Sequence, residues 1–261
     1  MTLFVTERRR AILNRLKAEG RVSVKDLSEE MRVSAVTIRQ DLRTLEREGL
    51  LERTYGGAVS TPNSDDFPPE LPFELRSTRN RQAKMMIGAA AAALIKEGSG
   101  IALDASTTAY AIVPYLKQFK KLTIVTNNLA VAQSFLNRPG VEIYVPGGRL
   151  KQTTMSIVGR PEALPDINLN MGFFGAGGIS LRGGMSDIEP DEVLMKQMMI
   201  ARCIKPVIVV DDSKWGRTAP YTVLPSDQIT HIITTNQAPA DLVEEFWRMG
   251  IHVDTVPLSQ S

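Results

Sequence analysis

The sequence predicts a small α+β domain followed by a larger α/β domain with a mostly parallel sheet. Residues 1–60 show three short amphipathic helical patterns and then two short strand patterns. Residues 61–78 place several prolines among acidic and polar residues, which is typical of a linker or an extended arm. In residues 79–261, apolar strand patterns alternate with helical ones, and this alternation favours parallel strands covered on both faces.

Composition agrees with a globular chain that carries a local positive charge. The 261 residues are 43% hydrophobic and 23% charged, which is ordinary for a folded protein with a substantial core. The net charge of +2 excludes a uniformly polybasic nucleic-acid binder. Residues 1–60, however, hold 12 Lys and Arg against 9 Asp and Glu, a net charge of +3. The basic excess therefore lies in the first domain, where contact with phosphates would need it.

Cysteine usage and apolar stretches predict a cytoplasmic protein with no membrane partner. Cys203 is the single cysteine, so no intrachain disulfide can form, and its apolar neighbours indicate a buried thiol rather than a nucleophile. The apolar stretch at residues 87–95 is too short to span a bilayer. The first residues lead directly into an amphipathic helical pattern and show no signal-peptide pattern. A reducing compartment fits these observations.

The elements of the first domain follow from apolar spacing and capping residues. In order, we expect a helix over residues 6–18, a helix after Ser23, a helix from Ser34 to about Glu48, and strands at residues 50–54 and 58–59. A short turn separates the second helix from the third, and Gly49 ends the third. Three short helices followed by a two-stranded hairpin make a winged helix-turn-helix.

The third helix of this motif is predicted to bind the major groove of double-stranded DNA. Ile38 and Leu42 face the core, so the opposite face points outward. On that face, Arg39 is suited to guanine and Gln40 to adenine. The predicted DNA-binding residues of the helix and the wing are Ser34, Thr37, Arg39, Gln40, Arg43, Arg53 and Tyr55. The alternative is a generic three-helix bundle with a solvated charged face.

The second domain begins with a helix over residues 80–97, after which strands and helices alternate. The expected strands lie near residues 100–104, 121–126, 141–145, 171–175, 206–211, 230–234 and 251–256. The expected helices cover residues 107–118, 128–136, 189–203 and 239–249. This order predicts a mostly parallel sheet, and ligands of such sheets bind beyond the carboxyl ends of the strands.

Small polar residues follow several of these strands, which predicts an anion site. Asp104 ends a buried strand, and the residues after it open a helix whose first N–H groups, together with the helix dipole, attract a phosphate. The alternative is an ordinary helix cap. Lys214 would pair with the anion, unless it is simply a surface lysine. The predicted effector-binding residues are Asp104, Ser106, Thr107, Thr108, Asn127, Gly147, Gly148 and Lys214.

Three further patterns are not interpreted as sites. The glycines of residues 175–178 lack the full dinucleotide-binding fingerprint. The methionine stripe at residues 195–199 is more typical of a core or a subunit contact than of a cofactor site. His231 and His252 stand near strands without cysteine or carboxylate partners at ligand spacing. We therefore expect no metal site and no cofactor.

The first domain resembles the DeoR family of bacterial sugar-metabolism regulators. The resemblance rests on residues 33–42, Leu45, Glu46, Gly49 and residues 53–58. The family usually has a second arginine at the position of Gln40 and a histidine at that of Tyr55. Both positions are plausible DNA contacts, so these differences bear on the operator sequence and not on DNA binding itself.

The second domain resembles the sensor domain of the same family. The matching segments are residues 81–88, 103–108, 125–127, 147–148, 154–159 and 211–216. The resemblance implies a fold similar to ribose-5-phosphate isomerase, with a phosphorylated sugar or similar intermediate as effector. The family often has Asp or Asn at the position of Gly177, and Gly at that of Ser106 or Ala105, so the identity of the effector stays open.

Two functions compete on these observations. The first is a repressor of a sugar or carbohydrate catabolic operon that binds operator DNA as a homodimer or homotetramer and is relieved by a phosphorylated sugar or polyol. The second is a sugar-phosphate isomerase or hydrolase with an appended DNA module, with Asp104, Asp187 or Glu192 as general base. The sequence shows no second catalytic group at a defined spacing, so we favour the regulator and expect no enzyme.

Overall fold

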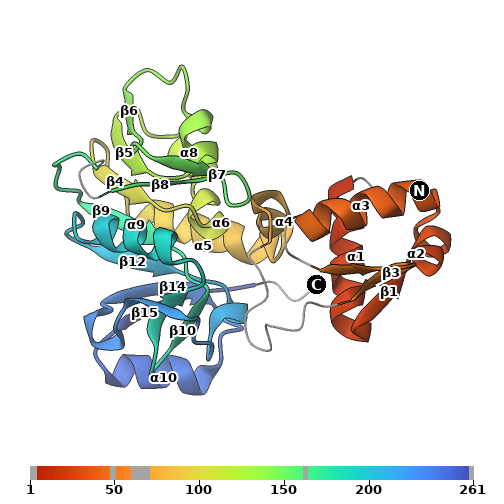
Figure 1. Cartoon of the computed structure of the whole chain (residues 1–261). Coiled ribbons are helices and arrows are strands. Elements are labelled where there is room, and N and C mark those ends of the chain that lie inside the picture. The colour runs from red at the N-terminus through yellow and green to blue at the C-terminus, as the bar shows by residue number, and fades with distance from the viewer. Residues whose placement is uncertain (1–4, 48–50, 60–70, 161–163, 259–261) are drawn as a thin grey trace. The chain divides into compact units, whose positions relative to one another are not determined.

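The computed structural model describes residues 5–47, 51–59, 71–160 and 164–258 (Figure 1). The chain divides into two compact units, Met1–Thr78 and Arg79–Ser261. Among the described residues, every helix is too short or too polar to cross a bilayer.

The first unit contains helices and a small antiparallel sheet. Its elements are α1 (Val5–Glu19), β1 (Arg21–Ser23), α2 (Val24–Met31), α3 (Ala35–Arg47), β2 (Glu52–Thr54), β3 (Gly57–Val59) and α4 (Phe73–Thr78). The three expected helices and both expected strands are confirmed. Strand β1, which the sequence analysis did not predict, pairs with β3, and the sheet has the order β1-β3-β2. Gly57 allows this pairing, because a Cβ there would lie 1.8 Å from the carbonyl oxygen of Val22.

The core of the first unit is formed by the inward faces of the helices and by the sheet. Its fully or nearly fully buried members are Ile12, Leu16, Val22, Val24, Leu27, Met31, Ile38, Leu42, Leu45, Leu51 and Ala58. Arg32 has a left-handed backbone (φ 53°) and ends α2, with its N–H donating to the carbonyl of Ser28. This cap forms the short turn that directs the chain from α2 into α3.

The segment expected as a linker is partly helical. Residues 60–70 lie outside the described residues, but the last six residues of the expected linker form α4. Phe73 and Leu75 of this helix are buried. The end of this segment is therefore packed through two apolar side chains, although its prolines and acidic residues had indicated a linker or an extended arm.

The second unit is built on a seven-stranded parallel sheet. Its strands are β4 (Gly100–Leu103), β5 (Leu122–Thr126), β6 (Val141–Tyr144), β9 (Met171–Phe174), β12 (Pro206–Val209), β14 (His231–Thr235) and β15 (His252–Val256). They follow the order β15-β14-β12-β9-β4-β5-β6, and every neighbouring pair is parallel. All seven strands were predicted, and the mostly parallel α/β architecture is confirmed.

Helices line both faces of this sheet. They are α5 (Arg81–Ala93), α6 (Thr107–Tyr110), α7 (Val113–Leu116), α8 (Leu129–Ser134), α9 (Pro190–Ile200) and α10 (Ala240–Arg248). One core cluster includes residues of α5, α6 and α7, and the other includes residues of α9 and α10. The expected helix over residues 107–118 is split into α6 and α7. Pro114, in the first turn of α7, explains the break, because proline has no N–H with which to continue the helix.

Short antiparallel strands lie outside the main sheet. They are β7 (Arg149–Lys151), β8 (Ser156–Val158), β10 (Gly178–Ser180), β11 (Gly184–Asp187) and β13 (Tyr221–Leu224). Strands β7 and β8 form a hairpin, and β10, β11 and β13 form a separate sheet. They were not predicted from the sequence, because most of them combine glycine or polar residues with one or two apolar residues and show no clear strand pattern. They matter because they carry Ser156 and Asp187, described below.

Candidate nucleic-acid interface and candidate effector site

Helix α3 begins with a hydroxyl cap that was predicted from the sequence. Ser34 Oγ accepts a hydrogen bond from the backbone N–H of Thr37 (3.1 Å). The two hydroxyl groups also lie 2.8 Å apart and share a hydrogen bond. Ser34 and Thr37 therefore fix the start of the helix, whatever else they contact.

A buried ion-pair cluster joins α3 to α1. The Asp41 side chain is only 2% exposed, and its two carboxylate oxygens face two arginines of α1. Arg8 pairs with Oδ2, and Arg9 Nε lies 3.1 Å from Oδ1. This contact sets the rotation of α3 about its own axis. The sequence analysis did not single out Asp41, because no local pattern connects it to residues 32 and 33 positions earlier.

The face of α3 opposite this cluster is open to solvent. Arg39, Gln40 and Arg43 are exposed, and Val36 beside them is 69% exposed. Ile38 and Leu42 are buried, as the helical spacing predicted. Three polar side chains with hydrogen-bonding capacity and one small apolar side chain thus share a helical face of the kind that reads base edges.

The turn between β2 and β3 presents the two predicted residues of the wing differently. Tyr55 is fully exposed at the turn. Arg53 is partly buried and pairs with Glu46 of α3 (Nη1 to Oε2, 3.4 Å), while its backbone N–H donates to the same carboxylate. Arg53 would therefore have to exchange Glu46 for a DNA phosphate.

In the second unit, the register of the sheet brings several predicted residues to one edge. Leu103 of β4 pairs with Thr126 of β5 and with Phe173 of β9. Asp104 and Asn127 therefore follow directly at the carboxyl ends of neighbouring strands. Asp104 is 1% exposed and accepts four hydrogen bonds or ion contacts from the groups described next. We call the polar residues at these strand ends the carboxyl-edge cluster.

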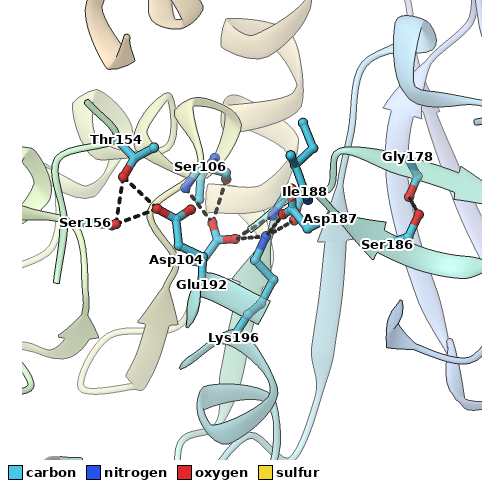
Figure 2. A network of polar contacts seen from close by, with 12 residues as sticks. Asp104, Ser106, Thr154, Ser156, Gly178, Ser186, Asp187, Ile188, Glu192 and Lys196 are labelled. Atoms are coloured by element: carbon cyan, nitrogen blue, oxygen red, sulfur yellow. Dashed lines mark hydrogen bonds and ion pairs between the residues drawn. The ribbon is translucent and has the colours of Figure 1, made fainter. Parts of the chain in front are cut away.

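Lys196 of α9 is the centre of this cluster (Figure 2). Its Nζ lies 3.0 Å from Asp104 Oδ2 and 2.6 Å from Asp187 Oδ2, and it donates to the carbonyl oxygen of Gly175 (2.6 Å). Burial alone would lower the pKa of Lys196, but the two carboxylates outweigh it and raise that pKa above its ordinary value. The ammonium is therefore charged, and it neutralises part of the negative charge of Asp104 and Asp187.

Ser106 is held by Asp104 instead of facing an anion. Its Oγ donates to Asp104 Oδ1 (2.6 Å) and accepts the N–H of Ala109 (3.1 Å), so it caps α6. The N–H of Gly175 donates to Asp104 Oδ2 (3.1 Å). A Cβ at Gly175 would lie 2.4 Å from Ser106 Oγ. The glycine run at residues 175–178 thus permits a close approach of two loops.

A lysine and two asparagines near these strand ends are buried in a way that indicates a ligand. Lys84 of α5 is buried, and its Nζ donates to Thr107 Oγ1 (2.9 Å) beside the equally buried Thr108. Asn127 Oδ1 and Asn128 Nδ2 are buried atoms with no hydrogen-bond partner among the described residues. Buried polar atoms are normally paired, so unpaired ones at a strand edge call for an explanation.

A second acidic contact extends the cluster. Glu192 Oε1 accepts hydrogen bonds from Thr154 Oγ1 and Ser156 Oγ, each at 2.6 Å (Figure 2). Lys151 lies 3.5 Å from the same oxygen. Helix α9 thus carries both Glu192 and Lys196, four residues apart, toward the strand ends.

Comparison with protein families identifies both parts of the chain. Residues 8–63 match the DeoR-like helix-turn-helix domain, and residues 79–236 match the DeoR C-terminal sensor domain. The chain belongs to the DeoR family. It is a DNA-binding transcription regulator and not an enzyme.

Individual relatives of this DeoR-family regulator match along nearly their whole length. A protein named as the aga operon transcriptional repressor of Escherichia coli O157:H7 is 33% identical, over 95% of this chain and 93% of the relative. The HTH-type transcriptional regulator GolR of Listeria innocua is 30% identical over 96% and 98%. The glycerol-3-phosphate regulon repressor of Escherichia coli K12 is 30% identical over 92% and 94%.

Among solved structures, ribose 5-phosphate isomerase A from Neisseria gonorrhoeae matches 54% of this chain and 56% of its own, with a TM-score of 0.39 and 16% identity. An eIF2B delta subunit from Chaetomium thermophilum matches 61% and 57%, with a TM-score of 0.41 and 13% identity. Structural similarity this low does not identify the fold or the activity of the regulator.

The structure does not bring every predicted effector residue into the carboxyl-edge cluster of the regulator. Gly147 and Gly148 are exposed between β6 and β7, and a Cβ at Gly148 would lie 2.2 Å from the carbonyl oxygen of Val158. Packing against β8 therefore accounts for that glycine. Lys214 is half-buried at the end of a 3₁₀ helix (Asp212–Lys214) capped by Asp211, which also accepts from Asn80 beside α5.

Two predictions about isolated residues need correction. His231 and His252 were expected to lack carboxylate partners, and this is wrong: the pairing of β14 with β15 brings both beside Asp254. Cys203 is partly rather than fully buried, and its Sγ donates to the carbonyl of Met199. Burial raises the pKa of this thiol to about 12, which agrees with the expectation that it is not a nucleophile.

Sequence reasoning missed Lys196. Lys196 is the single basic residue of α9, and apolar residues occupy positions 193–195 and 198–200 around it. A lone lysine in an apolar helical segment was the available signal, because a buried ammonium needs carboxylate partners. Those partners, Asp104 and Asp187, lie 92 and 9 positions away in the sequence, so only the fold identifies them.

Proposed function

We propose that this regulator represses a carbohydrate catabolic operon in the cytoplasm, and that a phosphorylated sugar or polyol relieves the repression. Relatives named for the aga operon and for the glycerol-3-phosphate regulon support this class of target. The observation that carries the effector part is the carboxyl-edge cluster, where a buried lysine and two unpaired amide atoms lie at the end of a parallel sheet.

On the DNA side, helix α3 would enter the major groove with Arg39, Gln40 and Arg43 toward the base edges. The exposed Val36 would add an apolar contact to a thymine methyl group. Ser34, Thr37, Arg53 and Tyr55 would contact the sugar-phosphate backbone, Arg53 after leaving Glu46. Two copies of the chain, in a homodimer or homotetramer, would bind two half-sites about one helical turn apart.

On the effector side, Lys84 would supply positive charge to the phosphate, and Thr107 and Thr108 would supply hydroxyl donors. Lys84 is buried and its Nζ donates to Thr107 Oγ1, so its charge lies at the start of α6. Lys214 would add a second positive charge. Asn127 Oδ1 would accept a hydrogen bond from a sugar hydroxyl, which would satisfy that buried atom.

Asp104 and Ser106 would then position the site without binding the phosphate themselves. A carboxylate repels a phosphate, but Lys196 offsets part of the charge of Asp104, and Ser106 already donates a hydrogen bond to that carboxylate. Gly147 and Gly148 would close the site only if the loop between β6 and β7 approaches the ligand.

The test has two stages and uses the full-length chain. Selection from a random duplex library yields the operator, and fluorescence anisotropy then measures operator Kd with and without a panel of sugar phosphates, polyol phosphates and their unphosphorylated parents. We expect one phosphorylated compound to raise Kd by about 5- to 150-fold, with no effect of its parent. An operator Kd unchanged by the whole panel would contradict the effector proposal, and a library without enrichment would contradict DNA reading by α3.

A further inference from the structure

The two histidines of this chain, His231 and His252, are the first residues of the neighbouring strands β14 and β15. His231 and His252 are direct partners in the parallel register of the two strands. Their rings lie 4.8 Å apart, edge to face. A chain with only two histidines thus places them together, although 20 residues separate them in sequence.

A carboxylate completes the group. Asp254 lies two residues after His252, so both side chains are on the same face of β15. Its Oδ2 lies 2.8 Å from His231 Nε2, and its Oδ1 lies 2.9 Å from His252 Nε2. One ligand atom from each residue falls within 4.8 Å of the others. We call this group the histidine pair site.

We propose that the histidine pair site binds a first-row divalent cation, with Zn²⁺ as the best fit. Two imidazole nitrogens and one carboxylate oxygen are a donor set that Zn²⁺ accepts, whereas Mg²⁺ prefers oxygen alone. Ligand atoms about 2.1 Å from a tetrahedral ion lie about 3.4 Å from one another. The present contacts of 2.8 and 2.9 Å would open by about half an ångström, and any pair of ligand atoms near the 4.8 Å limit of the group would close by about 1.4 Å.

The side chains have the freedom to make this adjustment. The His252 side chain is 67% exposed and that of Asp254 is 40% exposed, while His231 is partly buried against the sheet. The remaining coordination position would face solvent and hold water.

This site is distinct from the carboxyl-edge cluster. His231 and His252 are the first residues of their strands, whereas Asp104 and Asn127 follow the last residues of theirs. In a parallel sheet these two sets of residues therefore lie at opposite ends of the strands. A bound ion would tie β15, the last strand at one side of the sheet, to β14. The proposal is therefore independent of the effector and goes beyond the proposed function.

The test uses the full-length chain without a polyhistidine tag. Calorimetric titration with ZnCl₂ should give one ion per chain. His231→Gln, His252→Gln and Asp254→Asn should each weaken binding at least about tenfold. The matched control is Glu142→Gln, which removes an exposed carboxylate from β6 at the opposite side of the same sheet and should change nothing. Zinc at about one hundred times its Kd should raise Tm by roughly 5 to 10 °C, and MgCl₂ should not.

A measurement on the unaltered protein guards against variants that misfold. The two histidines give two sets of imidazole proton resonances in NMR spectra, and both should shift together on addition of one equivalent of ZnCl₂. Resonances that stay in place, zinc binding that survives all three substitutions, or an equal response to MgCl₂ would each overturn the proposal.

Discussion

Replacing Lys196 with methionine tests whether the carboxyl-edge cluster depends on its central cation. Methionine keeps much of the length of the lysine side chain and removes the ammonium. The substitution deletes contacts to Asp104 Oδ2, Asp187 Oδ2 and the Gly175 carbonyl. The side chains of Asp104 and Asp187 are only 2% and 14% exposed, so water cannot readily replace the lost partner.

The magnitude follows from this burial. Removing one partner of a buried ion pair costs about 3–5 kcal/mol, because the remaining charge is left without compensation. For a unit of the size of Arg79–Ser261, each kcal/mol changes Tm by about 2–4 °C, so we expect Tm to fall by about 6–20 °C. The matched control is Lys205→Met, an exposed lysine of the same unit, which should change stability by at most about 0.5 kcal/mol.

Tryptophan fluorescence provides a selective assay. The chain has two tryptophans, Trp215 and Trp247, and both belong to the second unit. The pKa of Lys196 is raised on folding, so its stabilisation is fully present below the pKa of an unfolded lysine, about 10.4, and is lost only as pH rises through the higher folded value. The difference in Tm between wild type and Lys196→Met should therefore be the same at pH 7 and pH 9.

A double-mutant cycle separates the ion pair from simple packing. Adding Asp187→Asn to Lys196→Met should cost less than Asp187→Asn alone, because the carboxylate has already lost its ion pair with Lys196. A loss in the single variant below about 1 kcal/mol, or strictly additive losses in the cycle, would refute the view that Lys196 compensates buried charge.

Three other predictions follow from the two candidate sites and the cysteine. Arg39→Ala or Arg43→Ala should weaken operator binding by about 1–3 kcal/mol in anisotropy titrations. If the arginine contacts a base, the same substitution should weaken binding to DNA of scrambled sequence by less. Equal losses on operator and scrambled DNA would show that the arginine contacts a phosphate. Lys84→Met should leave operator Kd unchanged but raise the effector concentration needed for release by about tenfold or more, whereas the exposed Lys96→Met should not; a normal response would remove Lys84 from the site. Because burial raises the pKa of Cys203 to about 12, its thiol should react with a disulfide reagent at pH 8 at least about a hundredfold more slowly in the native chain than in guanidinium chloride, and equal rates would contradict the burial.

The main sheet was predictable because each of its strands is an apolar run between turn residues. The seven expected positions coincide with β4, β5, β6, β9, β12, β14 and β15 to within about two residues at each end. The strands that were missed have three or four residues, and most of them combine glycine or polar residues with one or two apolar residues. Some also pair with distant segments, as β1 does with β3. Weak local patterns therefore limited the prediction of secondary structure.

The candidate sites were predictable only where local sequence determines the geometry. Ser34 and Ser106 were expected near helix starts, and both are caps. Asp41, Lys196 and the histidine pair site depend on contacts between elements far apart in sequence. The prediction for His231 and His252 failed because Asp254, two residues after His252, was overlooked, and because strand register brings the distant His231 beside the same carboxylate.

The ion pairs of the first unit also bear on how operator affinity depends on salt. Arg8, Arg9, Arg15 and Arg53 face carboxylates of their own unit, so the count of 12 basic residues in residues 1–60 overstates the number of cations available to DNA. Each phosphate neutralised by a protein cation releases condensed counterions and steepens the fall of log K with log salt by about 0.9. Because these arginines pair within the first unit, the unit should release few counterions per half-site on binding DNA. The affinity of the regulator for its operator should therefore change little over a wide range of ionic strength.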